Sequence, residues 1–141
     1  MKIHEGISKS YIETIAKQII GGAIYVHRHL GPGLLESVYD AAMKEELRHR
    51  SLKFEAQRKI SITFREIKLS TELRCDLVVE DLIICELKSV EEIAPVHQAQ
   101  LLSYMRLAQL PKGLLLNFNT PIMREGIRSM VNDIYQNLPE Q

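Results

Sequence analysis

Two apolar, β-branched runs between Asp76 and Lys88 constrain the fold more than any other part of this sequence. The stretch reads DLVVEDLIICELK, and both halves have the composition of buried strands. Glu80 and Asp81 separate the halves, which predicts a hairpin with these two residues in its turn. Asp76, Glu86 and Lys88 interrupt the apolar runs, and a buried charge costs several kcal/mol unless it is paired or bound to a metal. We therefore expect these three side chains to act together.

Strand alternation brings these charges to one place. Glu86 and Lys88 are two residues apart, so both side chains leave the same face of the sheet. With the turn placed as above, Asp76 lies across the hairpin near Glu86. The two carboxylates and the Leu87 carbonyl oxygen are ligands suited to a hard divalent cation. The alternative is an ion-pair cluster on a solvated sheet face, without chemistry.

The two cysteines, Cys75 and Cys85, each precede one of these carboxylates. They have no CxxC spacing, so they do not form a zinc motif. Alternation predicts that both lie on the face opposite the carboxylates, as small buried apolar residues.

Other segments show helical or strand periodicity. Ser10 and Glu13 form a capping-box pattern at the start of a helix that ends before Gly31. A second helix is expected from Leu34 to about Arg50. The further elements are strand-like alternation over 54–69, a helix opened by Pro95, a strand over 113–118, a short strand or turn at 122–123 and a helix over about 125–137. The predicted order ααβββαβα is that of an α/β (α+β) protein with a mixed central sheet flanked by helices.

Composition and charge narrow the function classes. The 141 residues are 45% hydrophobic, as expected for one globular domain over residues 1–141. The first residues are too polar for a signal peptide, and no apolar run has the length of a membrane span. We therefore expect a cytoplasmic protein without a membrane partner. The expected oligomeric state is a monomer or homodimer. Basic and acidic residues balance at 18 each, which counts against tight nonspecific DNA binding. An enzyme that meets phosphates mainly through a metal, or one with positive charge confined to one face, remains compatible with this balance.

The motifs resemble a known group of enzymes. Asp76, the tripeptide Glu86-Leu-Lys88, and Gln100 with Tyr104 are similar to the signature of the PD-(D/E)xK nuclease superfamily in its RecB-like branch. The sequence GLLESVY over 33–39 matches the GxxExxY signature of a family of small prokaryotic proteins assigned to that superfamily. The resemblance covers roughly residues 10–130 and implies a restriction-endonuclease-like core.

The resemblance also implies roles for individual residues. Glu36, Asp76, Glu86 and the Leu87 carbonyl would be the ligands of Mg²⁺ or Mn²⁺. Lys88 would be the catalytic lysine. The residues that would contact the substrate or orient the site from the next helix are Gln100 and Tyr104. Cys75 stands where a proline often precedes the first aspartate.

Two nearby residues have competing interpretations. Tyr39, three residues after Glu36, is expected to pack or hydrogen-bond beneath the site rather than to react. His97 is a surface residue, a partner of a site residue or a substrate contact.

The implied function is a metal-dependent nuclease that hydrolyses phosphodiester bonds with metal-activated water, with DNA favoured over RNA as substrate. The alternative is a catalytically silent nuclease-fold module that binds or regulates, acting with a partner protein that supplies the nucleic acid. A purely structural charge cluster leaves Glu36 and the Gln100–Tyr104 pair unexplained.

Overall fold

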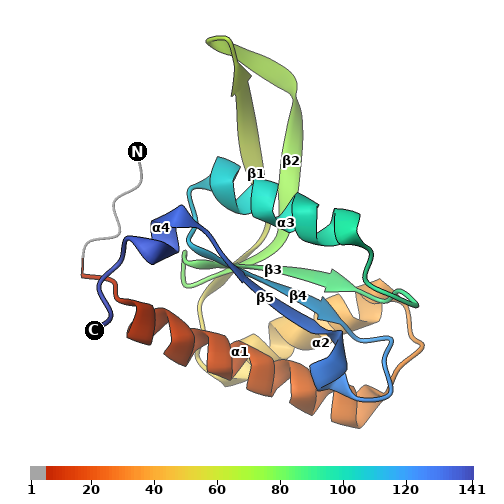
Figure 1. The fold of residues 1–141 in the computed structure, drawn as a ribbon. Coiled ribbons are helices and arrows are strands. Elements are labelled where there is room, and N and C mark those ends of the chain that lie inside the picture. Colours follow the sequence, from red (N-terminus) through yellow and green to blue (C-terminus); the bar gives the residue numbers. More distant parts are fainter. Residues whose placement is uncertain (1–5) are drawn as a thin grey trace.

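A five-stranded mixed sheet forms the centre of the computed structural model, which describes residues 6–141 (Figure 1). The strands lie in chain order, and only β3 and β4 run parallel to each other. The strand bounds are β1 Phe54–Phe64, β2 Ile67–Val79, β3 Ile83–Lys88, β4 Lys112–Asn117 and β5 Ile127–Val131. The predicted mixed sheet is therefore confirmed.

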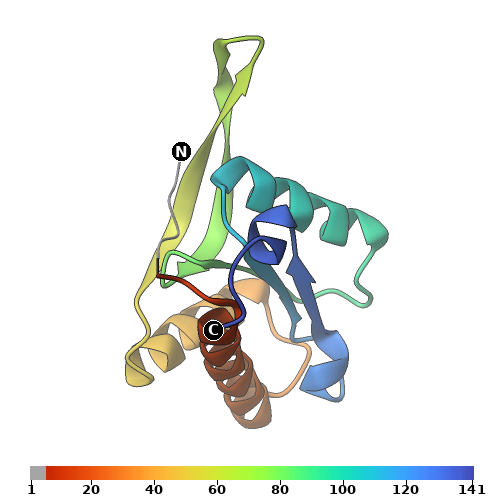
Figure 2. The same cartoon turned by 60° about the vertical axis from the view of Figure 1, so that its left-hand side comes forward.

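Helices cover both faces of the sheet (Figures 1 and 2). The long helix α1 and its neighbour α2 lie against one face, and α3, which connects the parallel strands β3 and β4, covers the other. The helix bounds are α1 Lys9–Leu30, α2 Glu36–His49, α3 Pro95–Ala108, the 3-10 turn η1 Met123–Gly126 and α4 Asp133–Gln136. No helix in the described range 6–141 is long and apolar enough to cross a membrane.

Two apolar clusters, one on each face, explain the alternating pattern of the central strands. Leu77, Cys85 and Leu116 pack toward α1 and α2. Ile84 and Leu115 pack toward α3. Because both faces of β3 and β4 are covered, these strands are apolar almost throughout, as the sequence predicts for interior strands.

The helix α1 starts two residues earlier than its capping-box pattern predicts. Ser8 is the N-cap, and its side-chain oxygen accepts a hydrogen bond from the Tyr11 amide. The amides of Lys9 and Ser10 donate to the carbonyls of Pro139 and Glu140. Because the C-terminal segment satisfies these amides, Ser10 lies inside the helix and the prediction that it caps the helix was wrong.

The predicted helix over 125–137 is wrong, because this segment contains the end of η1, the strand β5 and the short helix α4. Ile127, Met130 and Val131 have helical spacing, but they form β5, which pairs antiparallel with β4. The entry to this strand is tight, since a Cβ atom on Gly126 would lie 2.1 Å from the Asn117 carbonyl oxygen. Pairing with β5 satisfies the second edge of β4, and this outweighs local helix preference.

The outer parts of β1 and β2 form a projection, which we call the β-arm and define as residues 59–74 (Figures 1 and 2). The two strands pair with each other beyond the point where β2 leaves β3, with a register shift between Ser61 and Thr63. Arg65 and Glu66 form the turn, and both have a positive φ, of 51° and 67°. The predicted single strand-like stretch over 54–69 is thus the first strand, the turn and the start of the second.

Candidate functional site

The strands β2 and β3 separate at Asp76 and Glu86, and the two carboxylates occupy the fork. Backbone pairing extends from Val79–Ile83 only to Leu77–Cys85. Beyond it, the Asp76 amide donates to Glu86 Oε2 at 2.8 Å, and the Leu87 amide donates to Asp76 Oδ2 at 2.9 Å. The predicted proximity of the two carboxylates is therefore present, and each is fixed by the other strand.

The strand alternation breaks at the same place. Cys75 packs in the cluster under α3, whereas Leu77 packs toward α1 and α2. Gln57, on the neighbouring strand between the partners of these two residues, has a φ of +55° and hydrogen-bonds to Asp76 through its side chain. Cys85 packs on the face covered by α1 and α2, opposite Ile84, as alternation predicts. Cys75 packs on the other face, so the expectation that the two cysteines share a face was wrong, because the pleat of β2 is interrupted.

The loop before α2 brings Glu36 toward this fork. Glu36 is the first residue of the helix. The Tyr39 hydroxyl donates to the Gly31 carbonyl and accepts from the Leu34 amide, and Ser89 Oγ donates to the Leu34 carbonyl at 2.6 Å. The loop is therefore tied both to α2 and to the residue after Lys88.

Neighbouring backbone also fixes the end of β3. The amide of Phe118 donates to the Lys88 carbonyl at 3.0 Å. The buried Asn117 side chain accepts from the Val90 amide and donates to the Val90 carbonyl. These contacts hold the backbone on both sides of Ser89, so Lys88 leaves a well-anchored strand end.

Burial and mutual repulsion perturb the three carboxylates. Burial, followed by the charge of Asp76, raises the pKa of Glu86 to about 7. Burial raises the pKa of Asp76, and burial together with the charge of Asp76 raises that of Glu36. The Lys88 ammonium opposes each shift. These couplings show that Glu36, Asp76, Glu86 and Lys88 share one electrostatic environment.

The donor set suits a hard cation in kind. Carboxylate oxygens are the ligands that Mg²⁺ and Mn²⁺ prefer, and a cation would relieve the repulsion that raises the three pKa values. In the arrangement described for residues 6–141, however, no three Asp, Glu, His or Cys side chains are grouped closely enough to hold a metal ion. One oxygen each of Asp76 and Glu86 binds a backbone amide instead, which orients the carboxylate without using its other lone pairs.

The helix α3 places one of its two candidate residues against this environment. The pKa of Tyr104 is raised by partial burial and then by the charges of Glu86, Cys75 and Asp76. Gln100 lies one turn earlier on the same helix and is exposed. The phenol therefore lies within electrostatic range of the carboxylates, while Gln100 remains accessible to solvent.

Two other candidates have structural contacts. The Tyr39 side chain is fully buried, and its ring stacks on Phe118 with centroids 4.5 Å apart. His97 Nδ1 accepts a hydrogen bond from the Ala94 amide at 3.0 Å, which satisfies one free amide at the start of α3. These are supporting contacts of the kind that the sequence favours for Tyr39 and leaves open for His97.

Sequence reasoning missed three residues that support the site: Gln57, Ser89 and Asn117. Asn117 had a usable signal, because it is a polar residue at the end of a run of three leucines. Gln57 and Ser89 had none, since their roles depend on a positive φ and on a loop distant in sequence.

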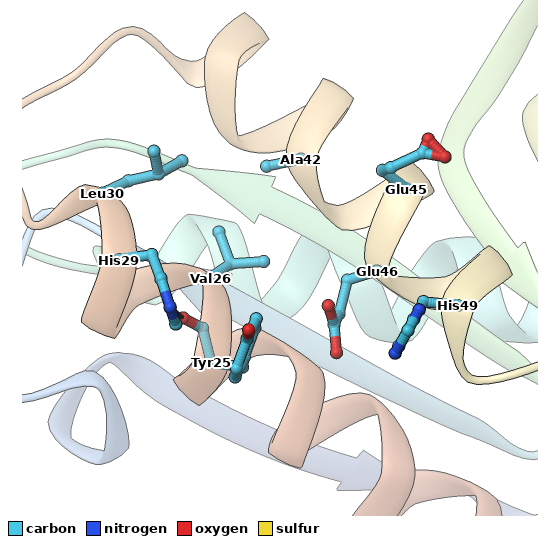
Figure 3. A pocket seen from close by; sticks show the side chains of 8 residues that line it. All are labelled: Tyr25, Val26, His29, Leu30, Ala42, Glu45, Glu46 and His49. Atoms are coloured by element: carbon cyan, nitrogen blue, oxygen red, sulfur yellow. Dashed lines mark hydrogen bonds between the residues drawn. The ribbon is translucent and has the colours of Figure 1, made fainter.

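A cavity of about 340 Å³ between α1 and α2 lies apart from these residues (Figure 3). Tyr25 and His29 from α1 and Glu46 and His49 from α2 line it, and none of the candidate residues does. Glu46 forms an ion pair with Arg50 at 2.7 Å. This cavity is therefore not the candidate site.

Comparison with known proteins adds the family. No curated protein is significantly similar to the sequence. The crystal structure of SSO0001 is similar with a TM-score of 0.47 and 15% identity, over 92% of this chain and 67% of that one. A model described as the PD-(D/E)XK nuclease superfamily matches residues 13–130. Because this match includes Glu36, Asp76, Glu86 and Lys88 and the sheet that carries them, the chain belongs to the PD-(D/E)XK nuclease superfamily.

Proposed function

We propose that this protein is a metal-dependent nuclease that hydrolyses phosphodiester bonds in nucleic acid, with DNA preferred to RNA. One observation carries the proposal: Asp76 and Glu86 share the fork between β2 and β3, with Lys88 at its end and Glu36 in the same electrostatic environment. These residue types resemble the superfamily's signature, and all four positions lie within residues 13–130, which the family model matches.

Glu36, Asp76, Glu86 and the Leu87 carbonyl are the groups that would hold Mg²⁺ or Mn²⁺. When bound, such a cation supplies Lewis-acid polarisation of a phosphoryl oxygen and a more acidic water. The backbone amides of Asp76 and Leu87 keep the two strand carboxylates oriented. Cation binding competes with protonation of Glu86, so the pKa of about 7 sets a lower limit on the useful pH.

The remaining residues act on the substrate. The Lys88 ammonium stabilises negative charge that develops at phosphorus and helps to orient the attacking water. Tyr104 faces the carboxylates and positions the substrate from α3, together with the exposed Gln100. Tyr39 acts indirectly by holding the loop that presents Glu36.

Further assignments belong to the same proposal. The residues Gly33, Glu36 and Tyr39 support placement in the GxxExxY family and the RecB-like branch of the superfamily. We also propose that the chain is one domain, acts in the cytoplasm of a prokaryote, and is a monomer or homodimer.

The test is cleavage of labelled single- and double-stranded DNA and RNA with Mg²⁺, Mn²⁺ or EDTA. Wild-type protein is compared with a Lys88→Ala variant purified identically. We expect metal-dependent cleavage by the wild type and a loss of about a hundredfold or more in the variant. Equal cleavage by both proteins, or none by either, contradicts the proposal.

A second candidate function is a catalytically silent nuclease-fold module that acts with a partner protein. The observation that favours it is the engagement of Asp76 and Glu86 with backbone amides, in a described chain where no three potential ligands are grouped around a metal position. A preformed cation site is stabilised by its ion through mass action, and a structural ion-pair cluster is not. Thermal unfolding with and without Mg²⁺ or Mn²⁺ therefore tests whether a cation site is present, and the cleavage assay tests whether that site is catalytic.

A further inference from the structure

The β-arm has one apolar and one polar face. Cross-strand pairing puts Ile60 opposite Leu73 and Phe64 opposite Ile67, so these side chains share one face. Near the base, Ile60 and Leu73 belong to the cluster under α3, but at the tip Phe64 and Ile67 are each 64% exposed. The apolar face therefore continues past the end of the core and is uncovered at the tip.

The opposite face of the arm is basic. Lys59 pairs with Arg74, and Thr63 pairs with Lys68 farther out. All three basic side chains are exposed, and none of them forms an ion pair with any described residue of the chain. Segment 59–74 holds four basic residues and two acidic ones, Glu66 and Glu72, and pairing with Ser61 puts Glu72 on this same face between Arg74 and Lys68. The arm therefore carries a net charge of +2 in a chain whose net charge is zero.

The Lys59–Arg74 pair is itself informative. Like charges directly opposite each other on an antiparallel pair destabilise the sheet. An anion that bridges the two cations would relieve this repulsion. The pair lies close to the fork along β2, since Arg74 precedes Asp76 by two residues.

We propose that the β-arm binds duplex nucleic acid beside the cleavage site. Lys59, Lys68 and Arg74 contact the phosphate backbone, and the tip with Phe64 and Ile67 enters a groove. The stretch from Ile67 to Arg74 extends about 25 Å at the usual rise of a strand. A major groove about 12 Å wide admits a two-stranded ribbon of this kind. Apolar tips also enter grooves between base steps. This inference rests on the proposed nuclease function and adds the form of its substrate.

Single strands fit the arm less well. Proteins that bind single strands stack successive bases on exposed aromatic side chains. The arm offers only one aromatic residue, Phe64, and the Arg65 guanidinium lies 5.9 Å from the centre of that ring. Charge complementarity along a ribbon, rather than stacking, is what this surface provides.

The test measures binding of a fluorescent 30-base-pair DNA duplex by anisotropy in EDTA, at several salt concentrations. The arm variant is K59E/K68E/R74E, and the matched control is K17E/R28E/R124E, which makes the same charge change at exposed positions of α1 and η1. We expect the arm variant to bind at least tenfold more weakly and to lower the slope of log K against log salt by about three. The control should change affinity less than threefold.

A single Lys59→Glu variant separates binding from folding. It places opposite charges across the strands, so we expect an unchanged or higher melting temperature together with weaker duplex binding. Failure of the wild type to bind the duplex in EDTA, or equal binding by the arm and control variants, overturns the proposal. If Phe64→Ser converts a sedimenting dimer to a monomer with unchanged duplex affinity, the tip joins two copies and the proposed groove contact is wrong.

Measuring binding in EDTA keeps this test independent of catalysis. A wild type that binds the duplex but does not cleave it with Mg²⁺ or Mn²⁺ contradicts the nuclease function and leaves the arm contact standing. If the K59E/K68E/R74E variant cleaves the duplex as well as the wild type does, only the arm contact is contradicted.

Discussion

Asp76 and Glu86 close the fork between two strands by exchanging hydrogen bonds, each carboxylate accepting from a backbone amide of the other strand. The two distances are 2.8 and 2.9 Å, and they replace the next rungs of the backbone ladder. The same carboxylates are thus structural and the best candidates for chemistry. Substitutions at either position must therefore be judged by stability as well as by activity.

The first prediction concerns Glu86 and pH. Its pKa is raised to about 7, so the folded protein binds more protons than the unfolded chain between about pH 4.5 and pH 7. The free energy of unfolding therefore falls as pH rises through this window. Glu86→Gln removes this titration. Between pH 4.5 and pH 8 its free energy of unfolding should therefore rise by up to about 3 kcal/mol relative to that of the wild type. Urea unfolding at several pH values measures the difference.

The control for this experiment is Glu45→Gln, at an exposed position of α2. The difference in free energy of unfolding between Glu45→Gln and the wild type should stay constant over the same pH range. A constant difference for Glu86→Gln as well would show that the buried carboxyl does not titrate in the expected window.

The second prediction concerns metal. A cation tenfold above its dissociation constant adds about 1.4 kcal/mol to the free energy of unfolding. Protons compete for Glu86, so the rise in melting temperature with Mg²⁺ or Mn²⁺ should be larger at pH 8 than at pH 6. Calorimetry of wild type and an Asp76→Asn variant measures it. An equal rise in both proteins would place the cation elsewhere.

Local sequence signals predicted the central fold well where packing agrees with them. The turn at Glu80 and Asp81 was correct because two apolar strands flank a polar pair, and both residues have a positive φ. The α3 helix begins at Pro95 as predicted, because proline suits the first turn of a helix. These signals are local and need no knowledge of distant partners.

Elements that depend on distant partners were predicted less well. The arm's turn at Arg65 and Glu66 contains no glycine or asparagine, although both residues have a positive φ, so the usual hairpin signal was missing. The strand β5 exists because β4 needs a partner, and its own sequence looks helical. The site residues show the same division. Strand spacing alone predicted that Asp76 lies near Glu86, whereas the prediction for Glu36 depended on resemblance to a family.

The third prediction concerns an ion pair between a buried lysine and a glutamate whose side chain is 43% exposed, which the sequence does not reveal. Lys112 Nζ lies 2.9 Å from Glu13 Oε2, which also accepts a hydrogen bond from Tyr135, and the lysine is 3% exposed. Glu13→Gln leaves a buried ammonium without its partner and should cost about 2 kcal/mol, whereas adding Lys112→Met should recover part of the loss. Chemical denaturation of both single variants and the double variant measures the coupling.

The exposed pair Lys9–Glu140 provides the comparison. Glu140 is 81% exposed, so Glu140→Gln should change the free energy of unfolding by less than about 1 kcal/mol. A loss for Glu13→Gln no greater than this would show that solvent screens the Lys112 pair as well.

The last prediction links a buried hydroxyl to the metal response. Tyr39→Phe keeps the ring that stacks on Phe118 but removes the bridge between the Gly31 carbonyl and the Leu34 amide. We expect a loss of about 1 kcal/mol, because two hydrogen bonds are removed but their other partners belong to Gly31 and Leu34, which solvent reaches. The loop before α2 then holds Glu36 less firmly, so Mg²⁺ or Mn²⁺ should raise the melting temperature less than in wild type. The control is Tyr25→Phe, at a residue of α1 that is 46% exposed. A full metal response in Tyr39→Phe would mean that Glu36 does not depend on this bridge for its position.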